Sequence, residues 1–241
     1  QRLTGKQIGS KYGFIANGLF QSEEEIANSA TVKGYKALPG YIKYVDRNGD
    51  GIITAAQDQG YVGKSATPKH TGSLNLFGNW KGFDFDLLFS WGLGNVVALT
   101  GQYTASGSEG TQDNTSFTKP FYHGGNSPTF LVENSWTPDH TNAEFPRLEI
   151  TGPSNNNGYS STFWYRNGNY MRLKTAQIGY NFPKKWLNPA GIEGLRLYVE
   201  GYNLLTFSGL TKYNIDPESP AVNNGYYPQQ RTYTLGVKLT F

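Results

Sequence analysis

The residues with the clearest chemical potential form a short acidic loop. Residues 46–58 read DRNGDGIITAAQD, with side-chain oxygens at alternate positions and a glycine directly after them. Calcium takes about six to eight oxygen ligands, and this spacing folds alternate side chains toward one point. At the twelfth position of such a loop a carboxylate is expected, but Gln57 stands there and the carboxylate follows one residue later. As a calcium site, the loop would use Asp46, Asn48, Asp50, the carbonyl of Ile52, and Asp58.

The same loop has a simpler interpretation as a tight turn. Asn-Gly and Asp-Gly pairs are common turn formers even where no metal binds. No pair of helices flanks the loop in the sequence, so a calcium sensor is not expected. Both a metal-stiffened loop and a bare turn therefore remain as hypotheses, and in both the stretch fastens a loop. No organic cofactor is predicted.

Aromatic residues supply the second candidate site. Residues 121–165 carry many rings among Asn, Ser and Gly, a composition that suits stacking on sugars while hydroxyl groups are hydrogen-bonded. The alternative is that these rings pack the segment itself or form an interfacial girdle. The candidate ligand-binding residues are Tyr122, Trp136, Trp164 and Tyr165.

Other kinds of chemistry have no support in the sequence. Cysteine is absent, and the three histidines show no metal-ligand spacing. No nucleophile elbow or paired carboxylates stand out, so no enzyme is predicted. The net charge of +3 is spread along the chain, which argues against a nucleic-acid partner.

Composition and periodicity predict an all-β fold. The chain of 241 residues has 15% aromatic residues and 30 glycines, which favour strands and turns. Four stretches alternate apolar and polar residues with the period of a two-faced strand. They are residues 73–91, with a turn at Lys81-Gly82, and residues 175–182, 195–207 and 231–241. Weaker strands are expected at residues 12–20 and 41–45, and Ser22 with Glu25 predicts a capped helix start.

The strands have the pattern of a transmembrane β-barrel. Asp84 and Asp86 lie opposite an apolar set of residues, as expected for a strand between lipid and an aqueous lumen. Long and short connections alternate along the chain, as they do in an up-and-down barrel. The acidic loop and the aromatic segment then fall on the same, extracellular rim. No signal peptide is visible at Gln1, so we expect either that it has been removed or that the chain begins elsewhere.

Several ordered stretches resemble one family of membrane transporters. They are YGFIANGLFQSEEEI, PGYIKYVDRNGDGIIT, NWKGFDFDLLFSWGLGN, SWTPDHTNAEFPRL, NYMRLKTAQIGYNFP, LRLYVEGYNLLTFSG and YYPQQRTYTLGVKLTF. Together they cover nearly the whole chain, which resembles the carboxy-terminal barrel portion of SusC-like TonB-dependent transporters (the SusC/RagA family) of Bacteroidota. The resemblance implies that residues 1–241 are the last five to seven strands of a plugged barrel of roughly 22 strands, with long extracellular loops.

The resemblance also implies a function and partners. The family imports nutrients across the bacterial outer membrane, driven by TonB, which would contact an amino-terminal region absent from this chain. A SusD-like lipoprotein closes over the extracellular side as a lid, and outer-membrane lipid surrounds the barrel. The resemblance implies an oligosaccharide or a peptide as ligand, and the composition of the aromatic segment favours the oligosaccharide.

Two other hypotheses account for the same strands. A secreted, calcium-stabilised β-sandwich that binds or cleaves glycans would share the strands, the rings and the acidic loop. A complete small barrel is also open, because about eight strands suffice to close one.

Overall fold

A computed structural model describes residues 5–99, 129–148, 157–218 and 229–241. The chain divides into two compact units, and each is described by itself. The loop unit is drawn from Gln1–Thr67 and Val96–Arg166, and the sheet unit from Pro68–Asn95, Asn167–Ser219 and Tyr226–Phe241. Of the helices in the described ranges, none has the length and apolar character needed to cross a membrane.

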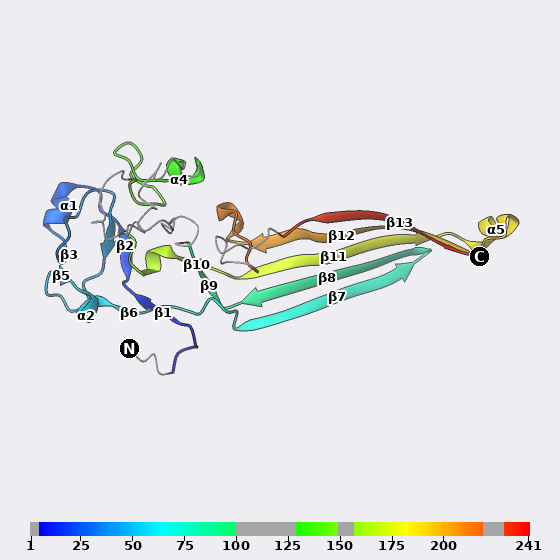
Figure 1. Ribbon diagram of the computed structural model, residues 1–241, viewed down its shortest axis with the longest axis horizontal. Helices are drawn as coiled ribbons and strands as arrows, with labels where there is room; N and C mark the ends of the chain where they lie inside the picture. Colours follow the sequence, from blue (N-terminus) through cyan, green and yellow to red (C-terminus); the bar gives the residue numbers. More distant parts are fainter. Residues whose placement is uncertain (1–4, 100–128, 149–156, 219–228) are drawn as a thin grey trace, which may run out of the picture. The chain divides into compact units, whose positions relative to one another are not determined.

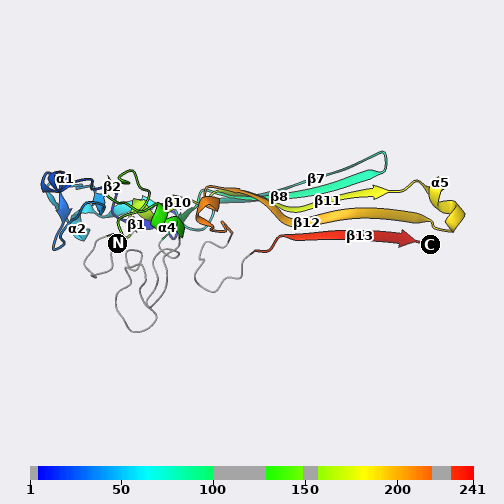
Figure 2. The same ribbon diagram turned by 90° about the horizontal axis from the view of Figure 1, so that it is seen from above.

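The sheet unit is built on one antiparallel sheet of five long strands. Their order is β13-β12-β11-β8-β7, with β7 and β13 at the two edges (Figures 1 and 2). The strands are β7 (His70–Trp80), β8 (Phe83–Leu93), β11 (Tyr170–Asn181), β12 (Gly194–Ser208) and β13 (Thr232–Thr240). All strands predicted in this unit are confirmed, and most extend beyond the predicted bounds. The described part of the sheet is open, so the closed barrel stays a prediction.

A two-residue turn joins β7 to β8, as the sequence predicted. Lys81 and Gly82 both adopt positive φ, at 49° and 91°, which matches the twist of a tight hairpin. A Cβ atom on Gly82 would lie 2.9 Å from the Tyr180 ring and 3.0 Å from the Asn181 carbonyl oxygen. Glycine is therefore required here both for its backbone conformation and for the close approach of β11.

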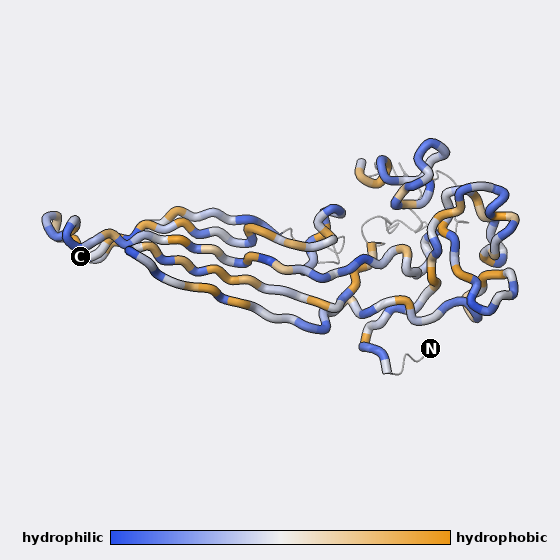
Figure 3. Tube along the Cα trace, turned by 180° about the vertical axis from the view of Figure 1, so that it is seen from behind, coloured by the Kyte–Doolittle hydropathy of each residue, from blue (hydrophilic) through white to orange (hydrophobic). Residues whose placement is uncertain are grey.

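Strict alternation gives the sheet two unlike faces, visible as alternating colours along each strand in Figure 3. The pairing places Phe85 opposite Ile178, Ile178 opposite Val199, and Val199 opposite Leu235, so that one apolar row crosses four strands. These side chains are largely exposed, with Leu235 at 78%. Exposed apolar area on this scale is unfavourable in water, because each apolar Å² that is buried gains about 25 cal/mol.

The opposite face of the sheet carries polar side chains that pair across strands. The Asp84 carboxylate on β8 accepts hydrogen bonds from the Arg196 guanidinium on β12 and, at 2.7 Å, from the Asn181 amide on β11. Arg196 also donates to the Gln177 side-chain oxygen at 2.8 Å. This network ties three strands together on the face that the sequence predicted to be wet.

A buried arginine fixes the connection that follows β12. Arg172 is 2% exposed, and its two terminal nitrogens donate to Glu218 at 2.6 Å and to Asp216 at 2.7 Å. Its Nε also donates to the Thr206 hydroxyl at 3.0 Å. Both acids follow the short helix η5 (Thr211–Tyr213), so the guanidinium clamps residues 209–218 to β11 and β12. We call this arrangement the arginine clamp.

Short helices lie at the end of the sheet unit where β7 turns into β8. α5 (Lys184–Leu187) and η4 (Asn188–Ala190) connect β11 to β12, and they lie at the same end as the β7–β8 turn and the last residues of β13 (Figure 1). Gly191 ends η4 with φ of 69°, the left-handed conformation that commonly terminates helices.

The loop unit consists of short paired strands and single-turn helices. The pairs are β1 (Lys11–Gly13) with β6 (Gly60–Gly63), β2 (Ala16–Leu19) with β4 (Ile42–Tyr44), β3 (Thr31–Val32) with β5 (Ile52–Ile53), and β9 (Val96–Ala98) with β10 (Tyr165–Asn167). The helices are α1 (Glu23–Ala27), α2 (Ala55–Asp58), α4 (Thr129–Glu133) and η3 (Thr162–Trp164). The sequence predicted long loops for much of this region, and it missed their packing into a unit with its own buried residues.

The predicted helix start is confirmed, with one difference in its capping. Ser22 precedes α1 and its side chain accepts from the Glu25 backbone N–H at 3.1 Å. The Glu25 carboxylate reaches back to the Gln21 N–H at 2.7 Å, one residue before the cap, and also pairs with Lys43. These hydrogen bonds, led by the one from Lys43, hold the pKa of Glu25 below its usual value.

The arginine clamp generates a test with a matched control. Replacing Arg172 with Met would leave Asp216 and Glu218 without their buried cation, a loss that typically costs about 3–5 kcal/mol. Replacing Lys174, which pairs with Glu218 at 3.0 Å but is 37% exposed, should cost less than about 1 kcal/mol. We expect hydrogen exchange across residues 209–218 to rise strongly in Arg172→Met and little in Lys174→Met. Equal exchange in the two variants would contradict the clamp.

Candidate functional site

The acidic loop closes on its own hydrogen bonds. The Asp46 carboxylate accepts from the backbone N–H groups of Gly49 and Gly51, each at 2.7 Å. The Asp50 carboxylate accepts from the Ile52 N–H at 2.9 Å and from the Asn48 amide at 2.8 Å. Gly49 and Gly51 adopt positive φ of 77° and 82°, which lets the backbone fold around Asp46. The predicted turn is thus present, and its acidic residues form it.

Asp58 fastens the neck of the loop. Its carboxylate is fully buried and accepts from the Arg47 N–H at 2.8 Å and from the Thr54 N–H at 2.7 Å. One side chain therefore holds both ends of residues 47–54. The Arg47 side chain adds a second tie, because its Nη1 donates to the Gln59 carbonyl oxygen at 3.0 Å. A Cβ on Gly60 would lie 2.1 Å from that Nη1, so a larger residue at this position would displace the guanidinium.

These contacts reduce the predicted calcium ligand set. Both oxygens of Asp58 are engaged with backbone N–H groups below the surface, so we reassign this residue from ligand to loop fastening. Asp46 is half-buried, Asn48 and Asp50 are exposed, and these three neighbouring residues would hold an ion if one binds. Among the described residues, no group of three or more His, Cys, Asp or Glu side chains is arranged to hold a metal. Calcium binding stays a prediction.

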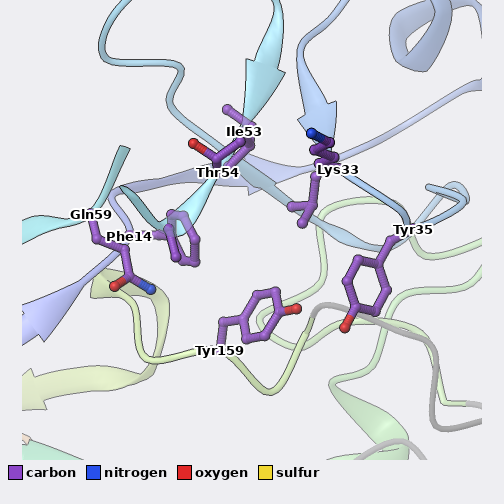
Figure 4. A pocket seen from close by; sticks show the side chains of 9 residues that line it. Phe14, Lys33, Tyr35, Ile53, Thr54, Gln59 and Tyr159 are labelled. Atoms are coloured by element: carbon purple, nitrogen blue, oxygen red, sulfur yellow. The ribbon is translucent and has the colours of Figure 1, made fainter. Parts of the chain in front are cut away.

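A pocket adjoins the loop within the same unit (Figure 4). Its volume is about 260 Å³, and Ile53, Thr54, Ala55 and Gln59 form one wall directly after the acidic turn. The other lining residues come from three further segments and are mostly aromatic or apolar: Phe14, Val32, Lys33, Tyr35 and Tyr159. The acidic loop is thus a structural support for this wall of the pocket.

Aromatic rings shape the other side of the pocket. The ring of Phe14 lies 5.6 Å from that of Tyr159, and Tyr35 meets Tyr159 edge-on at 5.8 Å. Burial, together with the neighbouring Tyr35 hydroxyl, raises the pKa of Tyr159 to about 12, so its phenol stays protonated at neutral pH. Within the described part of the chain, the side chains of Lys33 and Gln59 form no hydrogen bond to another residue. The pocket therefore offers rings for stacking and polar groups for hydrogen bonding, and no arrangement typical of catalysis.

Two of the predicted ligand-binding rings belong to the core. Trp164 is 1% exposed, and its Nε1 donates to the Asn157 carbonyl oxygen at 2.7 Å. Trp136 is also buried and donates to the Gln21 side chain at 3.1 Å. Because their faces are covered, we assign both rings to packing. Tyr122 lies outside the described residues.

Tyr165 and the buried amide of Asn157 each form a polar contact within the loop unit. Tyr165 is half-buried, with its hydroxyl 2.8 Å from that of Ser160. Asn157 accepts from the Ile42 N–H at 2.8 Å, which ties β4 to a segment more than a hundred residues away. Neither the pocket residues nor Asn157 were predicted as functional. The YGF motif at residues 12–14 carries Phe14, but the sequence does not show that Tyr35 and Tyr159 meet it.

The neck of the loop can be tested by a single-atom change. Asp58→Asn would point an amide N–H₂ at a backbone N–H and remove the charge, and hydrogen bonds to a charged group are worth about 1.5–3 kcal/mol each. We expect faster hydrogen exchange across residues 46–58 and at the pocket wall. Asp50→Asn, at an exposed position of the same loop, is the control and should have a smaller effect. Equal exchange in both variants would contradict the role of Asp58.

The acidic turn should respond to pH in a defined direction. Hydrogen bonds from backbone N–H groups, first that of Gly51, hold the pKa of Asp46 below its usual value. A carboxylate with a lowered folded-state pKa stabilises the fold above its unfolded pKa, which for aspartate is about 3.9. This contribution is lost as the pH falls through the lower, folded-state pKa. Exchange at Gly49 and Gly51, corrected for intrinsic rates, should therefore stay slow at pH 5 and rise only below pH of about 3.9.

Calcium binding is tested by calorimetric titration of the intact protein. If the loop holds an ion, calcium should release or absorb heat that is lost in Asp46→Ala and Asp50→Ala. Identical heats from the wild type and both variants would end the metal hypothesis, and the loop would then be a hydrogen-bonded turn alone.

Comparison with known proteins supports the predicted resemblance. No family model matches the chain. TonB-dependent receptor P3 of Formosa agariphila (strain DSM 15362 / KCTC 12365 / LMG 23005 / KMM 3901 / M-2Alg 35-1) is 31% identical over 98% of the chain. TonB-dependent receptor P26 of the same organism is 29% identical over 99%. The chain spans only 22% and 23% of these two relatives, respectively.

Solved structures show the same fold. A structure of the RagAB peptide transporter matches with a TM-score of 0.61 and 22% identity, covering 96% of this chain and 22% of that chain. The RagAB peptide importer in its open-open state matches with a TM-score of 0.59, covering all of this chain and 25% of that chain. The motifs, the two-faced sheet and these matches agree, and the chain belongs to the TonB-dependent receptors.

Proposed function

We propose that this chain forms part of an outer-membrane importer that takes up an oligosaccharide with energy supplied through TonB. The exposed apolar face of the sheet is the observation that carries this proposal. Four strands present one continuous apolar row, and the polar side chains pair on the opposite face. A bilayer on one side and an aqueous lumen on the other satisfy both faces at once.

The competing interpretation as a secreted sandwich does not account for this face. A sandwich buries the apolar face of one sheet against a second sheet. Among the described residues, the sheet unit contains a single sheet, and its apolar side chains are exposed. No observation on the described residues favours a glycan-cleaving activity.

The loop unit supports an oligosaccharide as cargo. Its pocket combines three aromatic rings with the polar side chains of Lys33, Thr54 and Gln59. Rings stack on the apolar faces of sugars, while amides and hydroxyls bond to sugar hydroxyls. The RagAB structures are of a peptide transporter and importer, so a peptide is the alternative cargo.

A surface lipoprotein of the SusD-like kind completes the proposed importer. The resemblance implies such a lid, and the loop unit provides folded structure against which it would close. Purification of the full receptor in mild detergent, followed by mass identification of bound partners and ligands, tests both parts. A lipoprotein with a bound oligosaccharide supports the proposal. A bound peptide would correct the cargo, and a receptor that does not enter the outer membrane would overturn the function.

A pair of neighbouring alanines tests the role of the pocket. Ala55 lines the pocket and is exposed, whereas Ala56, the next residue of α2, is exposed but does not line it. Ala55→Phe should fill the pocket without disturbing the core, and Ala56→Phe is the matched control. We expect Ala55→Phe to lower oligosaccharide affinity or uptake by tenfold or more and Ala56→Phe to have little effect. Equal uptake in the two variants would remove the pocket from the ligand path.

A further inference from the structure

We propose that one end of the sheet unit binds the headgroup of an anionic phospholipid. The inference rests on the proposed membrane location. We call this region the turn end, and it comprises the Lys81-Gly82 turn, α5 and the last residues of β13. Its aromatic rings, its lysines and the limit of the apolar face coincide there.

Rings form a continuous chain across the turn end. Phe83 lies 4.7 Å from Tyr180, Tyr180 lies 5.1 Å from Phe182, and Phe182 lies 6.4 Å from Trp186 (ring centroids). Trp186, on the single-turn helix α5, is 59% exposed. Trp80, which pairs with Phe83 across the hairpin, is 68% exposed. Tryptophan and tyrosine are enriched at the level of lipid headgroups, because their rings are apolar and their N–H or O–H groups are polar.

Three lysines accompany these rings. Lys81 lies with its Nζ 4.7 Å from the centre of the Trp80 ring, and Lys184 and Lys185 occupy the first turn of α5. The Asn181 N–H donates to the Gly82 carbonyl oxygen at 2.7 Å, so the hairpin turn lies next to the chain that leads into α5. The two segments that carry the lysines are therefore adjacent in the fold, although about a hundred residues separate them in the sequence.

The positive charge at the turn end is not neutralised by nearby side chains. Within the described part of the chain, none of the three lysines has a carboxylate oxygen within 4 Å. On the neighbouring strand β8, the Asp84 carboxylate is already paired with Arg196. Glu193, whose backbone N–H donates to Thr240, is the other acidic side chain at this end. With Lys238 near the end of β13, four lysines against one acidic side chain outside an ion pair leave a net positive site.

The position of this charge selects an anionic lipid. Lysines beside exposed rings place their methylene stems along the apolar boundary and their ammonium groups at headgroup level. Each Lys or Arg close to an anionic leaflet contributes about 1 kcal/mol. A phosphate bound by Lys81, Lys184 and Lys185, with acyl chains along Trp80 and the apolar face, satisfies both properties of the site.

The experiment uses the full receptor that contains this chain. It is reconstituted into nanodiscs of phosphatidylethanolamine alone or with phosphatidylglycerol or cardiolipin, and retained lipids are counted by native mass spectrometry. The test variant is Lys81→Gln, Lys184→Gln and Lys185→Gln combined. The control removes three exposed lysines of the loop unit, by Lys6→Gln, Lys36→Gln and Lys64→Gln, and so changes the net charge equally.

The test variant and the control variant have different expected outcomes. We expect the wild type and the control to retain anionic phospholipid over phosphatidylethanolamine, and the test variant to lose this preference by about tenfold or more. Equal retention in the test variant and the control would overturn the lipid site. The heat-induced shift in gel mobility, compared among the three proteins, shows that each barrel is folded. A receptor that does not insert into nanodiscs contradicts the proposed function, whereas insertion without lipid preference contradicts this inference alone.

Discussion

Cross-strand pairing in strict alternation is the constraint on which the sheet unit depends. Each strand has a side-chain period of two, so a register shift of one residue would move every apolar side chain to the polar face. The register is held by the tight turn at Lys81-Gly82 and by the polar bonds of Asp84 and Arg196. An irregularity between Leu173 and Thr175 interrupts the register once in β11. Beyond it, Met171 again pairs with Trp91, so the apolar face continues.

The polar elements of the protein are placed by this alternation. Arg172 falls on the polar face, where its guanidinium meets two acids from the following connection. An arginine at the next position would face the apolar side and could not form these bonds. The same rule puts Asp84, Gln177 and Arg196 within reach of one another from three strands. A pattern that is local in the sequence thus creates contacts between residues that are far apart.

The sequence predicted the sheet far better than the loop unit for a physical reason. In long alternating strands such as residues 231–241, the alternation itself shows which residues share a face. The turn at Lys81-Gly82 also has a distinctive sequence. The loop unit is held instead by single long-range contacts, such as Asn157 with Ile42, which leave no periodic signal. For the same reason the burial of Trp136 and Trp164 could not be read from their composition, and the rings were predicted to contact ligand. A turn was one of two hypotheses for the acidic loop, and the function of Asp58 depends on a neck that only the folded chain shows.

Because Asp58 closes the neck of the acidic loop, the positions of the two loop ends do not depend on the length of the loop. Both ends of residues 47–54 are held by one buried carboxylate, so the backbone enters and leaves the segment at fixed points. The entropic cost of closing a loop grows only slowly with its length, by about 0.6 kcal/mol for each doubling. The exposed residues at Asn48 and Gly49 are therefore a suitable place to insert an epitope tag or a fluorophore-binding peptide. Such a label would report on the surface of the loop unit while β5 and the pocket wall keep their positions.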